Sequence, residues 1–163
     1  LLLLMISATF TGKIIESFES ALASVTILTA FIPMIMDTGG NAGGQSSVSI
    51  IRALSLNDIE FKDIFKVIFK EFRVSILCAL TLALCNFVKL LVIDAVNVNV
   101  ALCVCLTLIA TVVLAKFIGC TLPMFAKKLG FDPAVMASPF ITTLVDACSL
   151  IIYFNIATVL LGI

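Results

Sequence analysis

The sequence contains no histidine, and charged residues make up only 12% of its 163 positions. Without histidine the chain lacks the commonest general base and a favoured ligand of transition metals, so any metal should be a hard, oxygen-preferring cation. Ten basic and ten acidic residues give a formal net charge of zero. This balance provides no basic footprint for nucleic acid, and we expect none as a partner.

Zinc-binding cysteine spacings are also absent, and all six cysteines lie inside apolar runs. Small buried thiols are therefore the plain interpretation. Two acids in apolar surroundings, Asp37 and Asp146, raise the alternative of an intramembrane enzyme with a carboxylate pair. No nucleophile–base partnership accompanies them, so we expect no enzymatic activity.

Apolar residues make up 62% of the chain, with a mean hydropathy of +1.28, which excludes a soluble fold. Five apolar spans are predicted, at about 1–15, 21–54, 74–93, 98–124 and 132–163. In residues 57–73, apolar residues recur at helical spacing on one face and basic residues lie on another, which predicts a separate amphipathic helix at the level of the lipid headgroups. We expect an all-α integral membrane protein with five transmembrane helices in one domain, residues 1–163.

The distribution of lysine and arginine predicts the orientation in the membrane. The connections after the second and fourth spans carry seven basic residues, whereas the opposite side carries two, Lys13 and Lys89. Basic connections are typically cytoplasmic, so the N-terminus should lie on the cytoplasmic side of the plasma membrane and the C-terminus on the extracellular side. The chain begins in an apolar run that lacks the features of a signal peptide, and we expect it to be part of a longer protein.

The second span is interrupted by a polar, glycine-rich stretch, residues 33–47. The span is too long for one straight crossing of about 20 residues. We therefore expect the glycines to break it into two half-helices with exposed carbonyls, which must line a cavity because unpaired backbone cannot face lipid. The candidate site residues in this stretch are Asp37, Thr38, Gly39, Gly40, Asn41 and Gln45.

The fifth span carries a carboxylate, Asp146, deep within apolar sequence. An acid at that depth costs about 2.5–3.5 kcal/mol on insertion scales, so a functional role is its default interpretation. Polar residues at helical spacing form a stripe with it: Ser138, Thr142, Ser149 and Tyr153, with Thr143 beside them. Hydrogen bonding between packed helices is the alternative, and for Ser149 and Tyr153 the two interpretations are equally weighted. For Lys116 in the fourth span, pairing or snorkelling is expected rather than a place in a cation path.

Both polar stretches supply carboxylate, amide, hydroxyl and carbonyl oxygens, which suit a hard divalent cation that retains some of its water. In chain order, they also carry two motifs that resemble those of the MgtE magnesium channel family. These are Pro33-x5-Gly39-Gly40-Asn41-x-Gly43-x-Gln45 and Asp132-Pro133-Ala134…Ser138-Pro139-Phe140-Ile141-Thr142-Thr143-Leu144-Val145-Asp146.

The resemblance implies a homodimer whose second and fifth helices line a central pore for Mg²⁺. The ion would keep most of its waters and be held by Asp146 of both subunits, with help from Gly40, Asn41, Ser138 and Thr142. Residues expected to line the pore around this site are Asp37, Gly39, Gln45, Thr143 and Ser149. Cytosolic N and CBS domains, which regulate members of this family, are absent from this sequence.

Two positions depart from the family pattern. Ser138 stands where asparagine is common, and Asp37 stands where glycine is frequent. An added carboxylate and a changed ligand leave room for a broader divalent pathway that admits Ca²⁺, Mn²⁺ or Co²⁺. A transporter that couples Mg²⁺ to Na⁺ or H⁺ at Asp146 is the other alternative to a channel.

Overall fold

The computed structural model describes residues 2–19, 23, 25–136 and 139–162, and this part of the chain is helical without strands. Five α-helices account for most of it: α1 (Leu2–Ser17), α3 (Ile32–Ser55), α4 (Ile64–Val92), α5 (Val98–Lys128) and α6 (Pro139–Leu161). Three short 3₁₀ helices join them: η1 (Thr26–Phe31), η2 (Phe61–Asp63) and η3 (Pro133–Met136). The predicted all-α class is confirmed.

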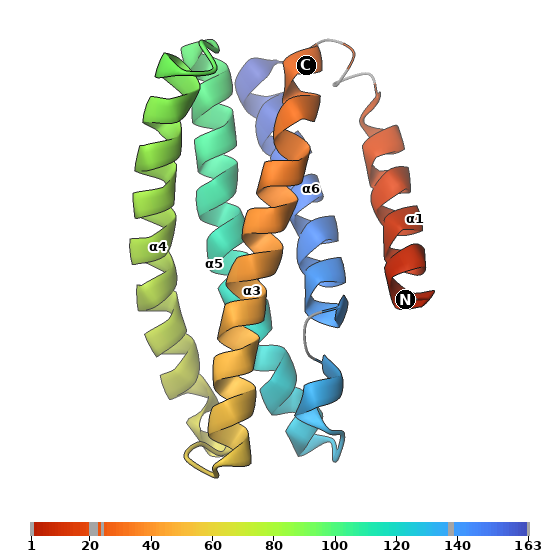
Figure 1. The fold of residues 1–163 in the computed structure, drawn as a ribbon, viewed down its shortest axis with the longest axis vertical. Helices are drawn as coiled ribbons and strands as arrows, with labels where there is room; N and C mark the ends of the chain where they lie inside the picture. Colours follow the sequence, from red (N-terminus) through yellow and green to blue (C-terminus); the bar gives the residue numbers. More distant parts are fainter. Residues whose placement is uncertain (1, 20–22, 24, 137–138, 163) are drawn as a thin grey trace.

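The helices run alternately up and down (Figure 1), and by its contacts the central helix is α5. It packs against α3, α4 and α6, and α3 also packs against α6, whereas α1 lies at the edge beside α6. A helix that is apolar all round belongs in the interior, and α5 fits this rule. The two basic connections, α3 to α4 and α5 to α6, lie at the same end of the bundle, as predicted (Figure 1).

Among the described residues, three helical segments are long and apolar enough to cross a membrane: Phe61–Val92, Val98–Lys128 and Pro139–Leu161. Helix α3 has 24 residues, but the polar residues in its middle lower its hydropathy. Helix α1 has 16 residues in the described part. The five helices match the number of spans predicted, and three of them qualify as membrane spans by length and composition.

The predicted break at the glycines is wrong, because α3 continues as one α-helix from Ile32 through Gly39 and Gly44 to Ser55. Pro33 lies in its first turn, where the missing N–H group is not needed. The irregular backbone comes earlier, in η1. A continuous helix pairs every backbone group internally, which the membrane interior demands, and close packing of the glycines offsets their poor helix propensity.

Two other predicted boundaries are also wrong. Residues 57–73 do not form a separate helix, since α4 continues from Ile64 into the apolar span that follows. The last helix starts at Pro139 and not at Asp132-Pro133. The carboxylate of Asp132 accepts a hydrogen bond from the Ala134 N–H (2.9 Å), so it caps the short helix η3 instead.

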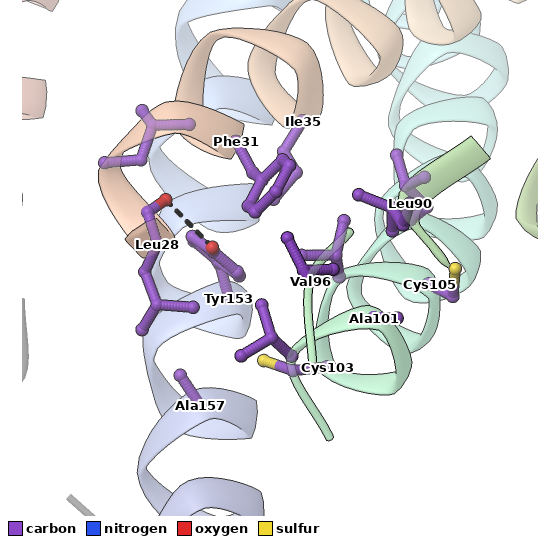
Figure 2. Close-up of a cluster of buried hydrophobic side chains, with 14 of the residues drawn as sticks. Leu28, Phe31, Ile35, Leu90, Val96, Ala101, Cys103, Cys105, Tyr153 and Ala157 are labelled. Carbon is purple, nitrogen blue, oxygen red and sulfur yellow. Dashed lines mark hydrogen bonds between the residues drawn. The ribbon is translucent and has the colours of Figure 1, made fainter. Parts of the chain in front are cut away.

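A cluster of buried hydrophobic side chains packs η1 against α6 (Figure 2). The hydroxyl of Tyr153 is fully buried and donates to the carbonyl of Leu28 at 2.9 Å. Phe154 stacks on Phe18 at 4.7 Å between ring centroids, and this contact holds α1 against α6. Tyr153 is therefore a packing residue, in agreement with the alternative that its polar group serves hydrogen bonding between packed segments.

Candidate cation site

Glycines bring α3 into close contact with its neighbours. A Cβ atom added at Gly119 of α5 would lie 2.2 Å from the carbonyl oxygen of Gly43, so the two backbones touch. A Cβ atom at Gly39 would lie 2.7 Å from Thr111 and 2.8 Å from Val145. Small residues allow this approach between membrane helices. As a result, polar side chains of α3 and α6 share one cavity.

This cavity has a volume of ≈ 160 Å³ and lies between α3 and α6. Its lining contains five predicted site residues together with Met36: Asp37, Gly40, Asn41, Thr142 and Asp146. A Cβ atom at Gly40 would be 3.2 Å from Thr142 Cγ2 and 4.0 Å from Asp146 Oδ1. Glycine at position 40 therefore leaves space next to the carboxylate.

A larger cavity of ≈ 570 Å³ adjoins the first, because Asp37 and Asn41 line both. It lies between α3, α4 and α5, and Thr38, Gln45 and Lys116 add polar groups to its wall. Four residues of α4 form the opposite wall: Leu77, Cys78, Thr81 and Leu82. Thr38 and Gln45 thus lie next to the Asp146 cavity and do not line it.

Three predicted residues line neither of these two cavities. Gly39 is buried where α3 meets α5 and α6. Ser149 is fully buried, and its hydroxyl donates to the carbonyl of Val145 at 2.6 Å. The hydroxyl of Thr143 donates to the carbonyl of Pro139 at 2.7 Å. The remaining candidate, Ser138, lies outside the described residues.

Sequence reasoning missed Glu71, which lies in the part of α4 that was assigned to the headgroup level. Its carboxylate is 3.5 Å from the Lys116 ammonium, and it accepts a hydrogen bond from the hydroxyl of Ser46. The expectation that Lys116 pairs is confirmed. The sequence signal for such an acid is Lys116 itself, because a lysine inside a long apolar span requires a partner.

The polar groups that could bind a cation in the smaller cavity are two carboxylates, an amide and a hydroxyl. Within the described ranges, no group of three His, Cys, Asp or Glu side chains comes together. Such a neutral-to-acidic set of oxygens suits a hard cation that keeps its water, and it lacks the soft ligands that transition metals favour. Asp37, Asn41 and Gln45 are exposed on the surface of this single chain.

The apolar helices and the oxygen-lined cavity define a multi-pass helical membrane protein with a candidate site for a hard cation. The chain belongs to the MgtE family of divalent cation transporters, which it matches over residues 32–156.

Three curated relatives carry the name magnesium transporter MgtE. The protein of Bacillus subtilis is 38% identical over 97% of this chain and 35% of its own length. The protein of Thermus thermophilus is 35% identical over 99% of this chain and 35% of its own length. The protein of Enterococcus faecalis is 34% identical over 91% of this chain and 32% of its own length. The chain therefore spans about a third of the length of these relatives.

Proposed function

We propose that this chain forms the pore of a channel that conducts Mg²⁺ across the plasma membrane. The observation that carries the proposal is the cavity in which α3 and α6 bring Asp37, Asn41, Thr142 and Asp146 together. An ionisable residue within a membrane helix is a functional-site candidate by default. The relatives named as magnesium transporters point to Mg²⁺ among the hard cations.

The size of the cavity favours a hydrated ion as the bound species. The cavity of one chain measures ≈ 160 Å³, which is room for several water molecules at about 10–15 Å³ of cavity volume each. Mg²⁺ gives up its waters reluctantly and is commonly bound through them. The cavity therefore has room for an ion that keeps its waters, with these waters donating hydrogen bonds to the carboxylate of Asp146 and the side-chain oxygen of Asn41.

A second copy of the chain would complete the pore. Asp37, Asn41 and Gln45 are exposed on α3, and polar groups at membrane depth require protein or water beside them. In a homodimer, these surfaces would face a shared aqueous path and two Asp146 carboxylates would act on one ion. The proposed mechanism is electrostatic attraction of the divalent ion, followed by passage with much of its hydration shell intact.

The orientation and the surroundings of the pore are part of the same proposal. The end that carries the basic connections faces the cytoplasm, the C-terminal end of α6 faces outward, and lipid covers the remaining apolar surface. The relatives are about three times as long as this chain. We place N and CBS domains that regulate the pore in the corresponding cytosolic part of the longer protein.

Electrophysiology on the protein in planar bilayers tests this function. We expect Mg²⁺ currents that follow the membrane potential when Na⁺ and H⁺ are equal on both sides. Transport that stops without a Na⁺ or H⁺ gradient would instead establish coupling. Replacing Mg²⁺ by Ca²⁺, Mn²⁺ or Co²⁺ in the same bilayer measures selectivity, and equal currents would establish a broad divalent pathway. The absence of any divalent current would overturn the proposal.

A further inference from the structure

The ion pair of Glu71 and Lys116 lies inside the bundle. The two side chains are 12% and 10% exposed, and Ser46 of α3, itself 2% exposed, donates to the carboxylate. Groups from α3, α4 and α5 therefore meet at one point. A buried pair of this kind contributes little net stability, whereas removal of one partner leaves an uncompensated charge.

Lys116 also borders the proposed cation path. It lines the ≈ 570 Å³ cavity with Asp37 and Asn41, and these two residues also line the cavity of Asp146. A fixed positive charge at this position repels a divalent cation, and the repulsion is stronger than in bulk water because the surrounding protein is less polar. A cation channel with a lysine next to its cavity therefore needs a means of neutralising it.

We propose that Glu71 is a positioning residue for cation transport: it neutralises Lys116 and keeps the neighbouring cavity attractive to Mg²⁺. The hydroxyl of Ser46 holds the carboxylate against α3, next to the residues that line the path. Lys66 and Lys70 share a ≈ 250 Å³ cavity with Glu71, but both are exposed at the basic end of α4, where solvent screens them. This proposal rests on the function proposed above.

The alternative is that the pair only joins α4 to α5. A purely structural pair predicts a loss of stability with no dependence of transport on the remaining charge. The proposed role predicts that transport follows the net charge of the pair. These readouts separate the two interpretations.

The experiment compares Mg²⁺ uptake into proteoliposomes for the wild type, Glu71→Gln, Lys116→Met and the double variant. We expect uptake by Glu71→Gln to fall by at least about tenfold, because a single positive charge then acts on a divalent ion. Removal of the lysine in the double variant should return uptake to within about threefold of the wild type.

Glu60→Gln is the matched control, since Glu60 is an exposed acid paired with Lys62 outside these cavities, and its uptake should match the wild type. Wild-type uptake by Glu71→Gln, or failure of the folded double variant to recover, would overturn the proposal. If Glu71→Gln does not fold, Lys116→Met carries the test, and loss of uptake by that folded variant would also overturn it. Failure of the underlying function is recognised separately, since the wild type itself would then show no uptake.

Discussion

Replacement of Asp146 by asparagine removes the charge at the centre of the proposed site and keeps the shape of the side chain. Asp146 is partly buried and lines the ≈ 160 Å³ cavity with Asn41 and Thr142. The substitution retains an oxygen acceptor for water. Any change in transport therefore reports the charge more than the packing.

The magnitude follows from the geometry of a hydrated ion. Mg²⁺ lies about 2.1 Å from its water, and that water lies about 2.7 Å from a carboxylate oxygen, so ion and carboxylate are about 5 Å apart. Their attraction is between about 2 kcal/mol at the dielectric constant of water and about 7 kcal/mol at an effective value of 20. A water-containing cavity is intermediate, at about 3 kcal/mol. Because 1.4 kcal/mol corresponds to a factor of ten, we expect Asp146→Asn to weaken Mg²⁺ binding by at least about 100-fold, since in the proposed homodimer the substitution removes the carboxylate from both subunits.

The assay is the initial rate of Mg²⁺ influx into proteoliposomes that contain a Mg²⁺-sensitive dye, at an ion concentration below saturation. Asp94→Asn is the matched control, because it makes the same chemical change at the α4–α5 connection, where Asp94 pairs with Lys89 at 2.7 Å. Its rate should stay within about twofold of the wild type, as expected for an exposed ion pair. A rate for folded Asp146→Asn equal to that of Asp94→Asn would refute the assignment of Asp146 to the ion site.

Two further predictions concern the packing that forms the site, both measured as thermal unfolding in detergent. Gly119→Ala should destabilise the protein by about 1–3 kcal/mol, since its new Cβ atom would meet the Gly43 carbonyl oxygen at 2.2 Å. Gly44→Ala is the control and should be neutral or stabilising, because no atom lies within 4 Å of its new Cβ atom. A larger loss of stability in Gly44→Ala than in Gly119→Ala would contradict this packing. Tyr153→Phe should cost about 1–2 kcal/mol because the buried carbonyl of Leu28 loses its donor, and an unchanged unfolding temperature would show that this hydrogen bond contributes nothing.

Some properties of this chain could be predicted from its sequence because they depend on composition and local pattern. A 62% apolar chain without histidine belongs to a membrane protein and favours a hard cation. Asp146 stands out because the free-energy cost of a carboxylate in an apolar membrane helix is high, whatever the positions of its neighbours in the fold. The sequence also predicted that the two basic connections lie at the same end of the bundle, because two spans separate them.

Tertiary packing decided the form of the glycine-rich helix. Local propensity favoured a break at Gly39 to Gly44, but contact with Gly119 and Val145 makes the glycines useful within a continuous helix. These contacts join residues far apart in the chain, and no local pattern contains them. The break was therefore predicted in the wrong place.

The division of the polar residues was also a tertiary decision. Asp146 and Ser149 share one stripe in sequence, yet one lines the cavity and the other is buried against α3. Glu71 became relevant only when α4 placed it 3.5 Å from Lys116. The residue types of the candidate cation site were determined by the sequence. Their grouping depended on how closely three helices approach one another, because the distances between helices are set by side chains from all of them.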